Sequence, residues 1–168
     1  MLIKDRPKLV IKKTGVERVL DVTTCMLFII FTLFFTHQWM TLPYEIPIHF
    51  NMKGEPDGWG GKWIVWIPLL IALILWIGLS ILEKYPHTYN YLNLNVDNAE
   101  RQYKNARFMV NIMKAEITIF LMYTTWMILD FSSQKGADTH QAWLPIVLFI
   151  IVLFGSIGFF IYRSFKLK

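Results

Sequence analysis

Four long apolar segments constrain the fold of this chain more than any other feature. Residues 22–44, 63–82 and 143–162 contain no charged residue, and residues 108–130 are apolar apart from Lys114, Glu116 and Asp130. A helix of about 20 apolar residues crosses the hydrocarbon core of a membrane. The composition agrees, because 55% of the residues are hydrophobic and the mean hydropathy is +0.41. We therefore expect an all-α integral membrane protein with four transmembrane helices, at about residues 19–41, 63–82, 98–130 and 143–163.

The basic residues predict how these helices are oriented. Thirteen of the 17 Lys and Arg residues lie in the N-terminal arm, the connection after the second helix or the C-terminal tail. Loops on the cytoplasmic side of a membrane carry an excess of Lys and Arg. We expect a basic cytoplasmic arm (1–18), a single membrane domain (19–168) in the cell membrane, a cytoplasmic loop (83–97) and cytoplasmic termini. The first apolar run is too long for a cleaved signal peptide, so we expect it to remain as an anchor.

The loop at residues 42–62 faces outward on this topology and is richer in structure than a simple connection. Ile46, Ile48 and Phe50 alternate with Pro47, His49 and Asn51, which predicts a short edge strand or an extended segment. On that geometry His49 and Asn51 share one face, and the isoleucines face the protein or the lipid headgroups. The Pro-Asp-Gly and Gly-Gly sequences that follow predict tight turns.

The polar residues of this loop form the first candidate site. His49, Asn51, Glu55, Asp57 and Trp59 lie within eleven residues and could form a binding surface. His49, Glu55 and Asp57 are also weak candidates for metal ligands, although their spacing matches no zinc signature. The alternative is a role in shaping the loop, with Asn51 and Asp57 fixing turns.

Three polar residues in the third apolar segment form the second candidate site: Asn111, Lys114 and Glu116. Charges inside a membrane helix are costly unless they are paired. Lys114 and Glu116 point about 200° apart on a helix, so they cannot simply pair with each other. An interior ion pair or hydrogen bond and a path for protons or a ligand both remain open, with Asp21 and Arg107 as possible partners. At the start of this helix, Asp97 and Glu100 predict a capping box.

Several classes of function find no support in the sequence. No nucleophile–base set, phosphate-binding loop or dinucleotide fingerprint is present, so we assign no catalytic residue and no cofactor and expect a non-enzymatic protein. The net charge of +5 comes with no nucleic-acid-binding motif. Cys25 is the single cysteine, which excludes a disulfide within the chain.

Two blocks of sequence are similar to a known family. The motif Leu42-Pro43-x-x-Ile46-Pro47-x-His49-Phe50-Asn51-x-x-Gly54-x-Pro56-Asp57-x-Trp59-Gly60-x-Lys62 resembles the bacterial membrane family called domain of unknown function 1648. Residues 85–103 resemble a loop that follows this motif in the same proteins. The resemblance extends to the N-terminal part of SdpI-type immunity proteins, and it implies protection against a secreted toxin or signalling by recruitment of a repressor.

The first hypothesis is therefore recognition, toxin immunity or envelope signalling through the outer loop. Its partners would be membrane lipids, a peptide toxin or envelope ligand outside, and a protein inside. The alternatives are a membrane enzyme or transporter for a lipid-linked or small polar substrate, and an accessory subunit of a larger membrane complex.

Overall fold

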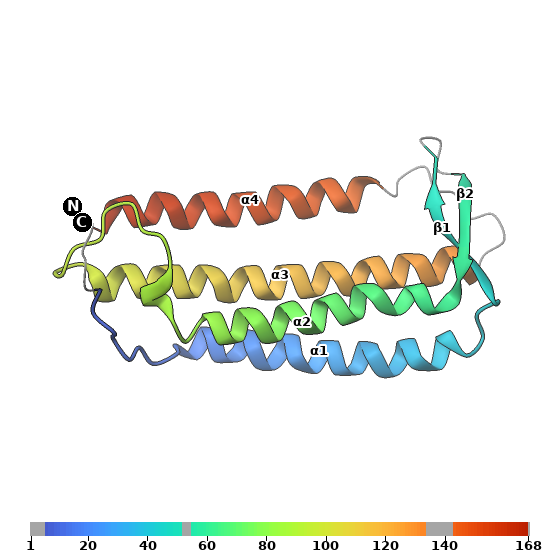
Figure 1. Cartoon of the computed structure of the whole chain (residues 1–168), viewed down its shortest axis with the longest axis horizontal. Coiled ribbons are helices and arrows are strands. Elements are labelled where there is room, and N and C mark those ends of the chain that lie inside the picture. The colour runs from blue at the N-terminus through green and yellow to red at the C-terminus, as the bar shows by residue number, and fades with distance from the viewer. Residues whose placement is uncertain (1–5, 52–54, 134–142, 168) are drawn as a thin grey trace.

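A computed structural model describes residues 6–51, 55–133 and 143–167. Within them, four helices are long and apolar enough to cross a membrane, which confirms the predicted mostly helical, four-helix architecture and indicates a multi-pass membrane protein. Figure 1 shows these elements. In chain order they are α1 (Gly15–Trp39), β1 (Glu45–Phe50), β2 (Pro56–Gly61), the 3₁₀ turn η1 (Lys62–Val65), α2 (Trp66–Leu82), the 3₁₀ turn η2 (Pro86–Thr88), α3 (Ala99–Ser133) and α4 (Trp143–Lys166).

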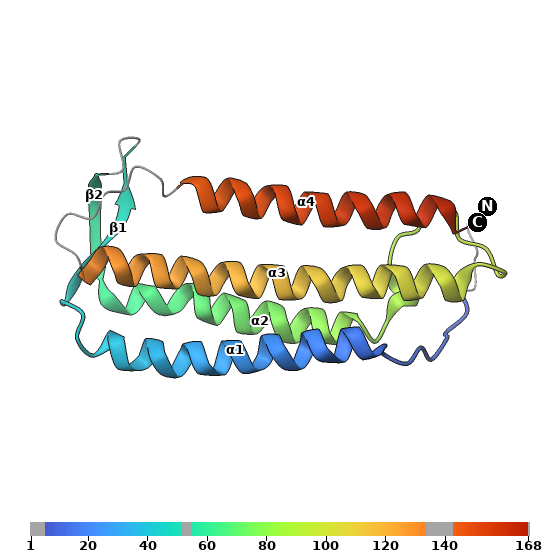
Figure 2. The same ribbon diagram turned by 180° about the vertical axis from the view of Figure 1, so that it is seen from behind.

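The helix α3 is the centre of the bundle. It packs against α1, α2 and α4, whereas α4 runs along α3 on the side away from α1 (Figures 1 and 2). The β1–β2 hairpin lies at one end of the bundle, which we call the hairpin end. Arg6 bonds to the connection between α2 and α3, and Leu167 bonds to Gln102 near the start of α3. The first and last described residues therefore share the opposite end, which we call the terminal end.

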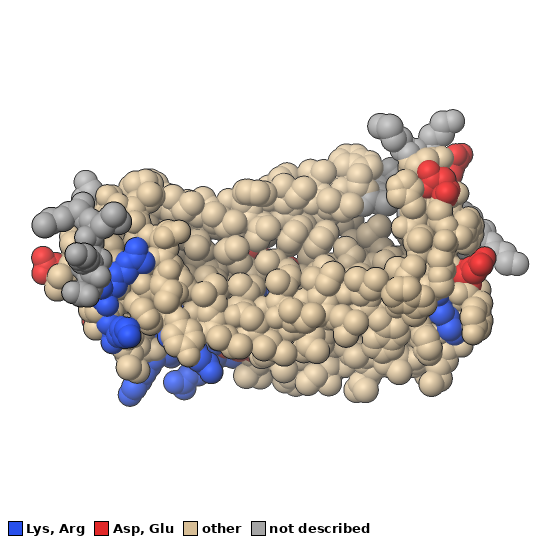
Figure 3. Space-filling view, viewed as in Figure 1, with Lys and Arg blue, Asp and Glu red and all other residues tan. Residues whose placement is uncertain are grey.

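The bundle has an apolar core in its hairpin half. The fully or nearly buried side chains there come from α1, the connection after it, the hairpin, η1, α2 and α3: Phe35, Leu42, Ile46, Val65, Leu69, Met122 and Leu129. Much of the outward surface of the helices is apolar and exposed, as a lipid-facing surface requires. Lys and Arg side chains gather at the terminal end of the face shown in Figure 3, and its middle carries few charges.

The second strand lies where the sequence predicted only turns. Residues Pro56–Gly61 pair antiparallel with β1, and the chain reverses earlier, between Asn51 and Glu55. The glycines make this pairing feasible because the strands approach closely. A Cβ atom on Gly58 would lie 2.9 Å from the Cβ of His49, which is too close for any side chain. Glycine is therefore required at this position in β2 by steric fit, and the turn interpretation was wrong.

The predicted alternation in β1 is also corrected. Register shifts lie between Pro47 and His49 and between His49 and Phe50, so the strand is irregular there. Ile46 and Pro47 are both buried, whereas Ile48 is 45% exposed. A bulge changes which side of a strand the following residues face, and the simple period of two is lost.

Helix capping also differs from the prediction. The helix α3 begins at Ala99, and the residue before it is Asn98 rather than Asp97. The Asn98 side chain bonds to the backbone of Asn93 and Asn95 and so orders the preceding loop. A complete capping box occurs instead at α1, where Thr14 and Glu17 bond each other's backbone N–H groups.

Candidate functional site

The hairpin is fixed firmly to the bundle. Ile46 is fully buried in the apolar core. The Lys62 ammonium group donates to the carbonyl oxygens of Trp39 and Leu42, at 3.3 and 3.4 Å, and lies 4.4 Å from the centre of the Trp39 ring. These contacts tie the start of η1 to the end of α1, and an ammonium over an indole is itself attractive. The hairpin is therefore held as part of the folded protein.

The five predicted loop residues lie on this hairpin as two pairs and a tryptophan, and all are exposed except the half-buried Asn51. His49 bonds Asp57 across the strands, with side chains 71% and 43% exposed. Asn51 bonds Glu55 at 2.9 Å and accepts the Glu55 backbone N–H at 3.0 Å, so this pair closes the turn. Trp59 is 59% exposed. Among the described residues, no group of three or more His, Cys, Asp or Glu side chains gathers in a way that could hold a metal ion.

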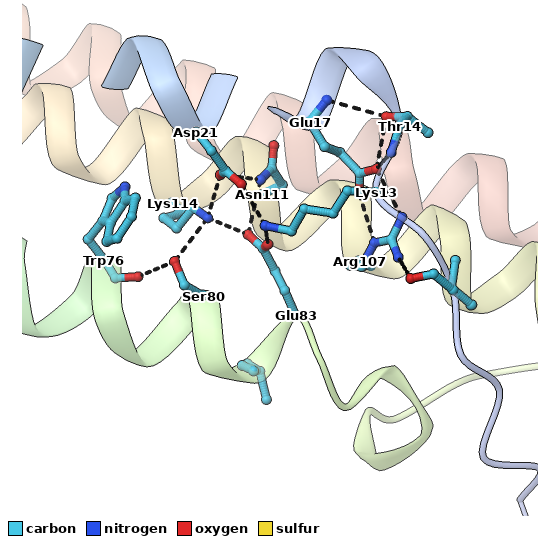
Figure 4. A network of polar contacts seen from close by, with 12 residues as sticks. Lys13, Thr14, Glu17, Asp21, Trp76, Ser80, Glu83, Arg107, Asn111 and Lys114 are labelled. Atoms are coloured by element: carbon cyan, nitrogen blue, oxygen red, sulfur yellow. Dashed lines mark hydrogen bonds and ion pairs between the residues drawn. The ribbon is translucent and has the colours of Figure 1, made fainter. Parts of the chain in front are cut away.

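A buried network of charges occupies the terminal half of the bundle (Figure 4). Its centre is Lys114 of α3, whose side chain is 1% exposed. The Lys114 ammonium lies 2.7 Å from Asp21 of α1 and 2.6 Å from Glu83 at the end of α2. It also donates to the hydroxyl of Ser80 at 3.1 Å and lies 5.1 Å from the centre of the Trp76 ring. Three helices thus meet at one ammonium group.

A second lysine and an amide complete this centre. Lys13 pairs with Asp21 at 2.5 Å and with Glu83, and Asn111 donates to the same two carboxylates at 2.8 and 3.1 Å. Partial burial opposes the charge of Lys13, but the bonds to Asp21 and Glu83 outweigh it and raise the Lys13 pKa above its ordinary value. Two ammonium groups thus balance two carboxylates.

A second buried ion pair lies beside this centre. Arg107 holds Glu17 with two bonds of 2.8 and 2.9 Å, and the two side chains are 3% and 1% exposed. Such a two-point pair is the strong form of an arginine–carboxylate contact. Arg107 also donates to the carbonyl oxygens of Ile11 and Lys12, at 2.7 and 2.9 Å. It therefore connects α3 to the segment before α1.

Glu116 faces a different neighbour from Lys114. Its carboxylate accepts a hydrogen bond of 3.1 Å from Ser156 of α4. Closer to the terminal end, Gln102 bonds Ser164 and the Asn105 amide donates to the carbonyl oxygen of Phe160. These contacts form a polar seam between α3 and α4. Polar contacts of this kind hold helices together inside a membrane, where no hydrophobic force drives association.

The sequence predicted Asn111, Lys114 and Glu116 as a polar set, but it assigned no site role to Lys13, Glu17 or Glu83. Asp21 and Arg107 appeared only as possible partners. A usable pattern was present: polar residues recur three or four positions apart near the same end of three helices, at 14, 17 and 21, at 80 and 83, and at 107, 111 and 114. Such spacing places side chains on one helix face.

The two sites are chemically different. The network is balanced in charge and mostly buried, and its charged groups pair with one another. Such an arrangement suits a structural role in which the pairs hold the helices together. The hairpin instead presents exposed carboxylates, a histidine and a tryptophan beside a strand edge, which suits binding.

The part of the chain that is similar to a known family contains the hairpin. Residues 26–80 match the family described as Domain of unknown function (DUF1648). The matched part contains most of α1, the whole hairpin and nearly all of α2, but not residues 85–103 or most of the charged network. Comparison with curated proteins and with solved structures gives no significant match. The hairpin and the helical segments on either side of it are thus the part of this chain that is similar to the DUF1648 family.

Proposed function

We propose that this chain is a multi-pass protein of the bacterial cell membrane that recognises an extended, cationic peptide through its β1–β2 hairpin. The terminal end faces the cytoplasm and the hairpin faces outward. The asymmetry of Lys and Arg along the sequence supports this orientation. Recognition of a secreted toxin or an envelope peptide, followed by immunity or signalling, is the physiological role that fits such a protein.

The observation that carries the proposal is an exposed, acidic hairpin on a rigid base. Glu45, Glu55 and Asp57 are all exposed, and Trp59 lies between two glycines of β2. The sheet has two strands, and β1 also packs against α3, so β2 is the more open edge. An extended peptide can add to such an edge through backbone hydrogen bonds, while the carboxylates select positive charge.

Binding to the purified protein in lipid nanodiscs tests this proposal. We expect cationic peptides to bind in a salt-dependent manner, and the double variant Glu45→Gln/Asp57→Asn to bind about two- to fivefold more weakly for each charge removed, as is typical of exposed pairs. Asp97→Asn is the matched control, because Asp97 is an exposed carboxylate at the terminal end. If both variants bind the peptides as wild type does, the hairpin is not the recognition surface.

A cellular test addresses the physiological role. A strain without this protein should become more sensitive to secreted peptides or other envelope-active agents, and the hairpin variant should fail to restore resistance while Asp97→Asn restores it. Unchanged sensitivity of the deletion strain would remove the support for immunity.

The second candidate is transport of a proton or a small cation through the terminal half. It is favoured by one observation, the buried ionisable groups around Lys114. The pairing of these groups with one another favours a structural role, in which they hold the helices together. Proteoliposomes loaded with a pH-sensitive dye distinguish the two, because a transporter gives a flux that Lys114→Met abolishes.

A further inference from the structure

The segment before α1 lies across the terminal end of the bundle with little regular structure. Residues 6–14, which we call the strap, contain no helix or strand. Two of its apolar side chains contribute little to its attachment, because Leu9 is 38% exposed and Val10 is 98% exposed, whereas Pro7 and Ile11 are half-buried. Attachment rests on polar contacts: Arg6 bonds to the carbonyl oxygens of His87 and Tyr89, Arg107 bonds to those of Ile11 and Lys12, and Lys13 reaches the charged network. The contacts of Arg6 and Lys13 involve partly exposed side chains, and polar contacts at a surface exchange readily with water and salt.

The position of Lys13 differs from that of Lys114. Both ammonium groups contact the same two carboxylates, Asp21 and Glu83. Lys114 is 1% exposed and projects from the central helix, whereas the Lys13 side chain is 31% exposed and projects from the strap. Asn111 is fully buried beside them, and its side-chain oxygen has no hydrogen-bond partner. The bundle itself thus supplies two carboxylates and one lysine, and the strap supplies the second positive charge.

We propose that Lys13 is a built-in occupant of a primary-ammonium site formed by Asp21 and Glu83, and that the strap can leave so that an ammonium group from outside the chain takes its place. Without Lys13, the two carboxylates keep a single ammonium partner, Lys114, and the centre carries a net negative charge. A primary ammonium restores the balance and offers three N–H donors to the acceptors around it. A quaternary ammonium carries the same charge but has no such donor. The strap would then respond to ligands on the terminal side of the membrane.

A spin label on the strap tests its release in the otherwise intact protein. Val10→Cys in a Cys25→Ser background gives one labelling position, on a strap residue that is 98% exposed. We expect ethylammonium to increase the label's mobility with a saturable dose dependence, while tetramethylammonium at the same ionic strength leaves it unchanged. Equal responses to the two salts would show simple screening of charge and would overturn the proposal.

Removal of the Lys13 ammonium group, which competes with an added ammonium ion, tests the site formed by Asp21 and Glu83. In Lys13→Met, ethylammonium should raise the thermal midpoint of unfolding at concentrations about tenfold lower than in wild type, because a short tether gives Lys13 an effective concentration in the millimolar range. The absence of such a shift in a folded variant would contradict the proposal, and if the variant does not fold, the spin-label result decides alone.

Spermidine and a lysine-containing dipeptide then distinguish a free polyamine from a protein lysine. Tighter binding than ethylammonium by either one supports the site and identifies its source, and the failure of both to bind would refute it.

Discussion

The charge balance around Lys114 makes a quantitative prediction. In Lys114→Met, Asp21 and Glu83 keep only Lys13 as a cationic partner, and their side chains are 20% and 0% exposed. Removal of one partner from a buried ion pair costs about 3–5 kcal/mol, because the remaining charge stays buried without compensation. Partial access of water to Asp21 favours the lower limit, so we expect a loss of about 3 kcal/mol in the free energy of unfolding.

Restoring the balance should recover part of this loss. The double variant Lys114→Met/Asp21→Asn has one ammonium and one carboxylate, Lys13 and Glu83, and should be about 1–2 kcal/mol more stable than Lys114→Met alone. Titration with SDS in mixed micelles, followed by far-UV circular dichroism, measures these energies. Lys104→Met is the control, because Lys104 is a half-exposed lysine of the same helix, and its loss should leave the midpoint unchanged. A loss below about 1 kcal/mol in Lys114→Met, or strictly additive effects in the double variant, would refute the argument.

Three further predictions concern other parts of the molecule. Gly58→Ala should destabilise the hairpin, since its Cβ would clash with His49, whereas Gly78→Ala in α2 has open space and should be neutral or stabilising by up to about 1 kcal/mol; thermal unfolding compares them. Ser156→Ala should loosen α4 from α3 and increase hydrogen exchange in α4, because Glu116 loses a donor. Because the folded state raises the Lys13 pKa, its stabilisation is present below the ordinary value of 10.5. The stability difference between wild type and Lys13→Met should therefore shrink as the pH rises beyond that value, in urea or SDS titrations over a pH series.

The helices could be predicted from sequence because their cause is local. A run of about 20 apolar residues has few alternatives to a spanning helix. Residues two positions apart on a helix point in nearly opposite directions, so the sequence also predicted that Lys114 and Glu116 have different neighbours. In the structure Lys114 contacts residues of α1 and of the end of α2, whereas Glu116 contacts α4.

The second strand could not be predicted in the same way. Glycine, proline and aspartate are depleted in strands and enriched in turns, so Pro56–Gly61 indicated turns. The strand forms because its glycines allow close approach to β1, a property that depends on the partner strand. The pairing of Asn51 with Glu55 moves the reversal of the chain to an earlier position than the Asp-Gly sequence suggested.

The charged network was hidden for a different reason. Glu17, Glu83 and Arg107 each lie near the end of an apolar run, where isolated charges are ordinary. Only the packing of the helices brings Glu83 to Lys13 and Lys114, and Glu17 to Arg107. The helical spacing of each set was visible in the sequence, but the choice of partners required the relative position of the helices.

The proposed orientation places the hairpin outside the cell and the strap in the cytoplasm. Labelling of single cysteines with a membrane-impermeant maleimide in intact cells tests it most directly, using Trp59→Cys and Val10→Cys in a Cys25→Ser background. Both positions are well exposed in the structure, so access depends on the side of the membrane. We predict labelling of Trp59→Cys in intact cells, and labelling of Val10→Cys only after permeabilisation. Labelling of Val10→Cys in intact cells, with Trp59→Cys protected until permeabilisation, would show the opposite orientation.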